Sequence, residues 1–468
     1  MLRRIVSERL NFALVFGFAS CLAWLMITLR AGVLLSGSMN PLQLHIPFYL
    51  LLAGSATLTL VSVAIFYRRM SADSLTGIIC FLPASAMSLA TISLLFISWA
   101  PLPYGSVLAA LCGLIAGISF AFLLVQWGRL WNILGFKTIV FSSIASWGLC
   151  QVFFFVVLLF DQIAAVLVAA ALPVVSIVLL RYNEKNTSPV PPFGPRRTKA
   201  PTGMILRLST LGFIYSFFNE YFRLSYIQRN PYDFDDLGFF TTNGLALLLV
   251  LIVVFMTIFL PAIRQLDILF ELPYRLLLML SVLGALLLII PGLSPMISYA
   301  INTAAYLCLG ITLWSVTICL CRRFPYHTIK IFGIVFAAWM AGPLVGAQLN
   351  HELITAGMLP VTEVSMVVGV FIMVLIYCFV FRETDIADTT MEGRTGAFEE
   401  KCAQVSWKHR LTERESELLT HLARGRDAGW IQEEFCLSKS TVSTHRQHIY
   451  EKLGVHTRQE LIDLIDAQ

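Results

Sequence analysis

Residues 181–204, RYNEKNTSPVPPFGPRRTKAPTGM, form the longest polar interruption in a chain that is otherwise largely apolar up to residue 382. The segment holds five prolines and five Lys or Arg residues, a composition typical of an exposed, semi-rigid linker. Six apolar stretches precede it and six follow, each long enough to cross about 30 Å of hydrocarbon as a helix. The sequence therefore predicts an all-α membrane bundle made of two six-helix halves joined by this loop.

The predicted spans set the expected domain boundaries. They cover residues 10–29, 46–66, 75–99, 104–125, 138–160, 163–180, 205–223, 238–260, 274–290, 296–320, 329–349 and 360–381. We expect residues 1–382 to form the membrane domain, 383–406 an acidic tether, and 407–468 a small four-helix domain. The tether is expected because residues 383–400 contain six acidic residues and one Arg, which favour a solvated segment.

The composition excludes most classes of soluble protein. Of the 468 residues, 57% are hydrophobic and 13% charged, and the mean hydropathy is +0.78. The ten cysteines form no CxxC pair and no cluster with zinc-ligand spacing. No Gly-rich phosphate loop or nucleophile elbow occurs. We therefore expect no catalytic residues, no metal site and no cofactor, and we interpret the chain as a membrane protein that is not an enzyme.

The distribution of charge predicts the orientation in the membrane. Residues 1–382 hold 22 Lys and Arg against 12 Asp and Glu, whereas residues 383–468 hold 11 against 16. With the N-terminus inside, 17 of these Lys and Arg residues fall on the inner side, and only Arg30, Arg223 and Arg229 fall in outer loops. Because cytoplasmic loops carry the excess of Lys and Arg, we expect both termini in the cytoplasm.

Charged residues inside a predicted span are functional candidates, because lipid does not solvate them. The span 205–223 carries Glu220 and Arg223, which are three residues apart and share a helix face. Glu220 follows Met204 by sixteen residues, so we expect it about 24 Å along the helix, near the outer surface. Two interpretations remain open for this candidate ligand or ion pair: an ion pair at a helix end, or a pair that faces a ligand in an outward vestibule.

Helix-capping motifs become frequent after residue 410. Residues 412–415, TERE, and residues 457–460, TRQE, are capping boxes, which predict that helices begin at these points. Ser438 is the predicted N-cap of a helix over 439–453, and Gly454 is its predicted end. A shorter helix is expected just before Ser438. Two helices joined by a tight turn, the second polar and basic on its outer side, predict a helix-turn-helix that binds double-stranded DNA.

The same region resembles the LuxR-type DNA-binding domain. The motifs that match in order and spacing are 411–415 LTERE, 423–425 ARG, 438–446 SKSTVSTHR, 449–455 IYEKLGV and 458–461 RQEL. The resemblance implies roles for the outer side of the third helix, which includes Ser440. The implied phosphate contacts are Lys439, Thr441, Arg446 and Lys452, and the residues implied to face base edges are Ser443, Thr444 and Gln447.

His445 has two interpretations, a packed residue that supports this surface or a phosphate contact. Residues 401–468 contain ten basic and ten acidic residues, so we expect one copy of the domain to bind DNA weakly. We therefore expect a homodimer that binds an operator made of two half-sites.

The six-plus-six arrangement around 181–204 resembles the major facilitator superfamily, in which a cytoplasmic loop joins two six-helix halves. Together the two resemblances imply a bacterial transcription regulator of the inner membrane, in which a bundle that senses an unknown small-molecule effector or a membrane condition is fused to a DNA-binding domain. The alternative is a solute transporter with a regulatory or protein-docking cytoplasmic tail.

Overall fold

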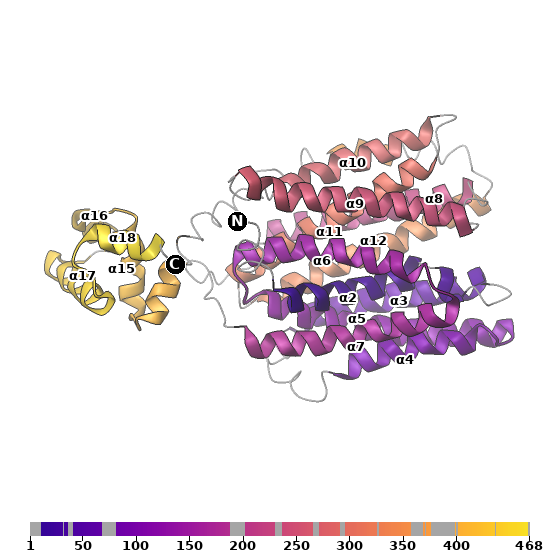
Figure 1. Cartoon of the computed structure of the whole chain (residues 1–468), viewed down its shortest axis with the longest axis horizontal. Helices are drawn as coiled ribbons and strands as arrows, with labels where there is room; N and C mark the ends of the chain where they lie inside the picture. Colours follow the sequence, from indigo (N-terminus) through magenta and orange to yellow (C-terminus); the bar gives the residue numbers. More distant parts are fainter. Residues whose placement is uncertain are drawn as a thin grey trace.

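The computed structural model describes residues 11–30, 32–35, 41–67, 81–187, 202–229, 236–264, 271–290, 295–324, 327–356, 368–369, 371–375, 398, 401–435 and 437–466. Within these ranges the regular structure is entirely helical. Figure 1 shows most of the helices aligned in one bundle, with the C-terminal helices beside the end of the bundle at which α2 begins. The predicted all-α fold class is therefore confirmed.

The first half of the bundle precedes the polar loop. Its elements are α2 (Phe12–Arg30), the short 3-10 helix η1 (Gly32–Leu35), α3 (Pro41–Ile65), α4 (Phe81–Ile97), α5 (Leu102–Trp131), α6 (Phe136–Val157) and α7 (Gln162–Asn186). Helix α2 packs against α6 and α7, while α5 packs against α3 and α4. These six long helices match the first six predicted spans.

The second half follows the loop. Its described helices are α8 (Thr202–Arg229), α9 (Asp236–Arg264), α10 (Glu271–Ile289), α11 (Pro295–Arg323) and α12 (Thr328–Thr355). They match predicted spans seven to eleven. Most of the twelfth predicted span, 360–381, lies outside the described residues, as does most of the predicted linker, so the twelfth span stays a prediction.

Seven of the described helices are long and apolar enough to cross a membrane, and α4 and parts of α9 and α10 form shorter apolar helices. Helix α8 is absent from this group because it carries several charged and amide side chains. It nevertheless packs closely against α12 and α11. Charged residues on a helix in this setting are expected to face the bundle interior rather than lipid.

Pairs of glycines spaced four residues apart let helix backbones touch at one contact in each half. In the first half, a Cβ added to Gly117 of α5 would overlap the carbonyl oxygen of Leu52 on α3. In the second half, a Cβ added to Gly342 of α12 would overlap the hydroxyl of Ser216 on α8. Gly113 and Gly346 complete the two GxxxG motifs. Close backbone packing of this kind is a common way for membrane helices to associate.

The C-terminal domain is formed by α15 (Glu413–Ala423), α16 (Ala428–Phe435), α17 (Lys439–Leu453) and α18 (Arg458–Asp466). Its hydrophobic core is separate from that of the bundle. Residues 401–408 are also helical, and Cys402 and Val405 are buried in this core. The tether predicted over 383–406 therefore extends too far, because its last residues carry apolar side chains that the domain core buries.

We predict that Gly117→Ala destabilises the bundle, because the new methyl group meets the backbone of α3, which has no room to yield. Overpacking of this kind costs about 1–3 kcal/mol. The thermal unfolding midpoint of the full chain in lipid nanodiscs should fall by several degrees. Gly54→Ala is the matched control, since a Cβ at Gly54 meets no atom within 4 Å. Equal midpoints for the two variants would contradict the close contact.

Candidate functional site

A cluster of charged and polar side chains lies inside the bundle, between the two halves. Arg223 donates from Nε to Glu220 Oε2 at 2.9 Å and from a terminal nitrogen to Glu220 Oε1 at 2.5 Å. The two predicted site residues therefore form a bidentate ion pair on α8. Only 4% of Glu220 is exposed, and the Tyr49 hydroxyl of α3 lies 3.4 Å from its Oε1. The pair is buried among helices rather than open at a helix end.

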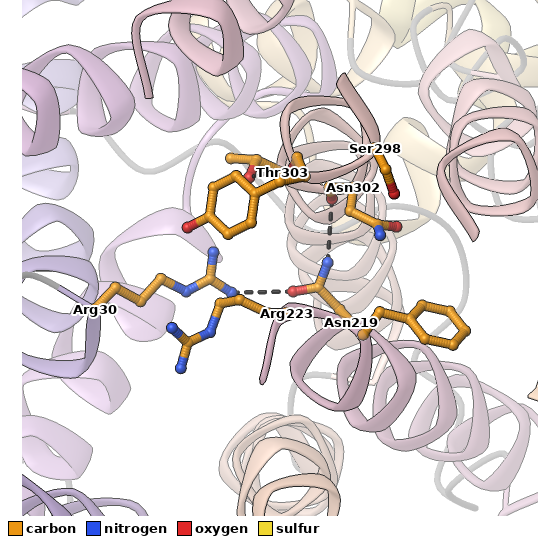
Figure 2. A pocket seen from close by; sticks show the side chains of 8 residues that line it. Arg30, Asn219, Arg223, Ser298, Asn302 and Thr303 are labelled. Carbon is orange, nitrogen blue, oxygen red and sulfur yellow. Dashed lines mark hydrogen bonds between the residues drawn. The ribbon is translucent and has the colours of Figure 1, made fainter. Parts of the chain in front are cut away.

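Arg30 is a member of this cluster that the sequence prediction missed. It was expected in an outer loop, but it ends α2 and donates to Asn219 Oδ1 of α8 at 3.0 Å. Asn219 in turn donates to the Asn302 carbonyl of α11 at 3.1 Å, as Figure 2 shows. The Arg30 guanidinium lies 4.7 Å from the centre of the Tyr306 ring. Arg30 is one of only three Arg residues expected on the outer side of the membrane, where cations are scarce, and this was the available sequence signal.

Among the residues that the structure describes, the positive charges of this cluster outnumber the negative ones. Two guanidinium groups, of Arg30 and Arg223, face one carboxylate, that of Glu220, which leaves a formal surplus of one positive charge. Small cavities of about 10 and 20 Å³ adjoin these side chains. Spaces of this size hold about one water molecule each. The cluster can therefore attract an anion, but in this conformation it has no room for an organic one.

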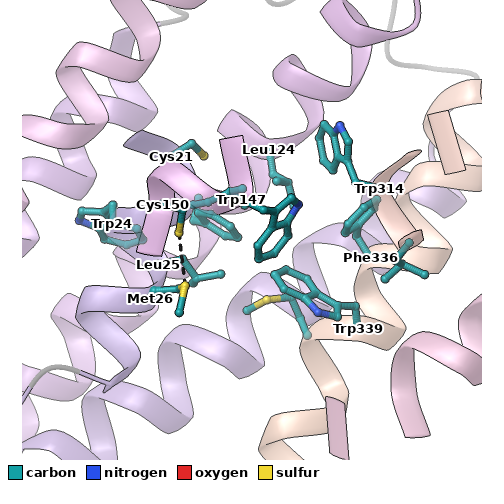
Figure 3. Packing of buried hydrophobic residues seen from close by; sticks show 14 of the residues in the cluster. Cys21, Trp24, Leu25, Met26, Leu124, Trp147, Cys150, Trp314, Phe336 and Trp339 are labelled. Carbon is teal, nitrogen blue, oxygen red and sulfur yellow. Dashed lines mark hydrogen bonds between the residues drawn. The ribbon is translucent and has the colours of Figure 1, made fainter. Parts of the chain in front are cut away.

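An aromatic layer joins the halves beside the polar cluster. The ring centroids of Phe18 on α2 and Trp314 on α11 are 4.2 Å apart. The ring centroids of Trp147 on α6 and Trp339 on α12 are 6.3 Å apart. Figure 3 shows Trp147, Trp314 and Trp339 gathered at this junction. Trp314 is completely buried. Large rings packed across the interface hold the two halves together in this arrangement.

The second candidate site is the outer side of α17 in the C-terminal domain. Ser438 caps the helix by accepting a hydrogen bond from the Thr441 N–H at 3.2 Å, and Gly454 ends it with a φ of 67°. Both boundaries agree with the prediction. Three apolar side chains anchor the inner face, and they are Val442, Ile449 and Leu453. This anchoring fixes which residues of α17 face solvent.

Most of the predicted DNA-binding residues lie on that solvent-facing side. The exposed members are Lys439, Ser440, Ser443, Thr444, Arg446, Gln447 and Lys452, while Thr441 and His445 are half-buried. Some of their polar groups have local partners. Thr444 donates to the Ser440 carbonyl at 3.0 Å, and Gln447 donates to Glu451 Oε1 at 3.0 Å. The exposed face thus combines three cations with uncharged polar side chains.

Lys452 has a partner that the sequence did not reveal. Its Nζ lies 2.6 Å from Glu415 Oε2, in the capping box of α15. The same carboxylate accepts from the Thr412 N–H at 2.7 Å, while the Thr412 hydroxyl accepts from the Glu415 N–H at 3.3 Å. The predicted capping box is present, and Lys452 ties it to the end of α17.

This arrangement perturbs the pKa of Glu415. Burial raises the pKa, but the hydrogen bonds from Lys452 and from the Thr412 backbone outweigh it, so the pKa is held below its usual value. Glu460 has a lowered pKa for a related reason, because it accepts from the His456 N–H at 2.8 Å. Glu415 is the buried member of the two, so its charge matters more for stability.

Residues 409–465 match the family described as "Bacterial regulatory proteins, luxR family". The C-terminal part of this chain is a LuxR-type helix-turn-helix domain.

Two curated relatives share this domain. Fimbriae Z protein of Salmonella typhimurium is 43% identical over 53 residues, which cover 11% of this chain and 25% of the relative. The uncharacterized response regulatory protein YgeK of Escherichia coli is 42% identical over 65 residues, which cover 13% of this chain and 44% of that relative. The chain thus spans less than half the length of either relative, and the likeness concerns the LuxR-type domain alone.

The bundle resembles a solved structure, that of the human organic anion transporter MFSD10 (TETRAN). The TM-score is 0.50 with 16% sequence identity, over 80% of this chain and 99% of the transporter. At this identity the likeness shows the fold and nothing further. The bundle therefore has the fold of a major facilitator superfamily transporter, as the six-plus-six pattern predicted, and the protein is a multi-pass membrane protein.

We predict that the LuxR-type domain loses stability as the pH falls below about 4.5, because a carboxylate whose pKa is lowered in the folded state stabilises it only while ionised. Denaturant unfolding of a fragment of residues 396–468 at pH 3–7 measures this loss. Glu415→Gln should flatten the acid limb of the profile, and Glu417→Gln, which removes an exposed charge, is the control. A Glu415→Gln profile that follows the wild type would contradict the role of the buried carboxylate.

We also predict that Glu220 and Arg223 are energetically coupled. Removing one member of a buried ion pair leaves an uncompensated charge and costs about 3–5 kcal/mol. Glu220→Gln and Arg223→Gln should therefore each lower the thermal midpoint of the full chain in nanodiscs, and the double variant should lose less than the sum of the two. Simple additivity would show that the pair contributes no buried interaction.

Proposed function

We propose that this protein is a membrane-anchored transcription regulator of the bacterial inner membrane, in which the bundle controls DNA binding by the LuxR-type domain. The observation that carries the proposal is the fusion itself. One chain joins a LuxR-type domain, which has its own hydrophobic core, to a bundle with the fold of a major facilitator superfamily transporter. Both parts are kinds of protein that bind and respond rather than catalyse.

The proposed orientation has both termini in the cytoplasm. It is supported by the excess of Lys and Arg in the loops on that side, and by the position of the LuxR-type domain beside the end of the bundle where α2 begins (Figure 1). DNA is accessible only in the cytoplasm, so this orientation is also the one that a DNA-binding function needs. Residues 1–382 then form the sensor, and residues from about 401 onward form the output domain.

In the proposed DNA complex, α17 lies in the major groove. Lys439, Thr441 and Arg446 hold phosphates, and Ser443, Thr444 and Gln447 face base edges. Lys452 combines a phosphate contact with its bond to Glu415, which fixes the end of α17. His445, half-buried beside them, supports the same surface. The equal numbers of basic and acidic residues in 401–468 favour two copies on two half-sites.

The proposed effector site is the cluster of Arg30, Glu220 and Arg223. Its surplus of positive charge favours a small anion. Since the adjoining cavities hold about one water each, an organic effector requires an arrangement in which the two halves have separated. A ligand that binds such an arrangement more tightly shifts the population toward it, and the LuxR-type domains then change their placement or pairing.

We predict that Arg446→Ala weakens binding of the full chain in nanodiscs to DNA selected by the wild-type protein from a random library. The loss of affinity should be nearly uniform across DNA sequences. The slope of log affinity against log salt concentration should become shallower by about one. Gln447→Ala should instead change which bases are preferred. Lys185→Ala, at the end of α7 and far from α17 in the sequence, is the charge control. Selective binding that both α17 variants leave untouched would remove the proposed interface.

The transporter alternative makes a different prediction. If the protein moves a solute and its tail only regulates that activity, reconstituted vesicles should show flux of an organic anion that persists after residues 383–468 are deleted. The regulator proposal predicts selective DNA binding and no such flux.

A further inference from the structure

A groove of about 580 Å³ runs between α3 and α12, which belong to different halves of the bundle. The α12 wall consists largely of small side chains, among them Ala338 and Ala341, and the α3 wall includes Val61 and Ile65. Both of these α3 side chains are exposed on the outer surface of the bundle. Lys330 lines the groove in the first turn of α12. The groove is therefore apolar along its length and carries a cation at one end.

The length of the groove matches the depth of one lipid leaflet. From Lys330 to Ala341 the helix advances eleven residues, or about 16 Å at the standard rise. Half of a hydrocarbon core of about 30 Å is close to the same distance. Both helices are candidate membrane spans. The groove thus reaches from the surface of the membrane to its middle, where acyl chains are the surrounding solvent.

One end of the groove carries a cation, Lys330. Within the part of the chain that the structure describes, no side chain forms an ion pair or hydrogen bond with the Lys330 ammonium group. Tyr67 also lines this end, with its hydroxyl 3.4 Å from His327 Nδ1. A cation at the boundary between hydrocarbon and water attracts an anionic lipid headgroup.

We propose that this groove binds one anionic phospholipid of the leaflet on the side of the LuxR-type domain. One acyl chain lies along the alanines of α12, and the phosphate contacts Lys330. The two helices touch just beside the groove, because a Cβ added to Gly333 of α12 would lie 2.8 Å from the Leu60 carbonyl oxygen of α3. A lipid that fills the groove contacts both halves, and it therefore stabilises the arrangement in which α3 and α12 are close.

The test measures lipid binding by the full chain, so its result does not depend on DNA binding. Purified protein is incubated with equal amounts of phosphatidylglycerol and phosphatidylethanolamine of the same acyl chains, and bound lipid is counted by native mass spectrometry. We expect the wild type to retain one phosphatidylglycerol in preference. Lys330→Gln should reduce that preference by about fivefold, the value of one Lys near an anionic headgroup. Lys330→Arg should preserve it.

Two further variants separate the groove from general effects of charge and folding. Lys185→Gln removes a cation near the same membrane surface, at the end of α7, and should keep the wild-type preference. Ala338→Phe fills the groove and should lower retention of both lipids. The thermal midpoint of each variant checks that it is folded. The proposal is overturned if Lys330→Gln and Lys185→Gln bind lipid alike, or if folded Ala338→Phe retains lipid as the wild type does. The proposal is also overturned if Lys330→Gln and Ala338→Phe change the oligomeric state of the protein but leave the amount of bound lipid unchanged.

Discussion

The dominant physical constraint on this molecule is that charged groups buried in the helix bundle have little or no water to solvate them and therefore need partners on the protein. Glu220, Arg223 and Arg30 satisfy it by lying inside the bundle, where each has a polar or charged partner on the protein. Placing them there requires the first and second halves to meet, since Arg30 belongs to α2 and the ion pair to α8. The association of the halves and the chemistry of the buried cluster are therefore one arrangement.

Close packing favours a few distinct arrangements of the two halves over a continuous range of them. Glycine pairs bring backbones into contact within each half, and aromatic rings on α2, α6, α11 and α12 interlock between them. Tightly packed interfaces tend to move between distinct arrangements rather than deform continuously. In the proposed mechanism, a ligand at the polar cluster and a lipid between α3 and α12 act on the same junction. The proposal is that both shift one equilibrium and that the LuxR-type domain responds to this shift.

Local chemistry in the sequence predicted some features closely. The Ser438 cap, the Gly454 stop and the Thr412–Glu415 capping box depend on neighbouring residues, and the structure has all of them. Contacts between distant residues carried no such signal. Lys452 and Glu415 are 37 residues apart, and Arg30 and Asn219 are 189 apart. The burial of Cys402 and Val405 also depends on tertiary packing, which explains why the domain begins earlier than the charge pattern indicated.

In the proposed regulator, the LuxR-type domain binds DNA while it is attached to the membrane bundle. The most direct measurement is to crosslink DNA to the full-length protein in cells, recover the protein from washed membranes, and sequence the DNA that comes with it. The account predicts discrete chromosomal sites enriched with the intact, membrane-bound chain. Enrichment only with a released soluble fragment, or no enriched sites at all, would contradict it.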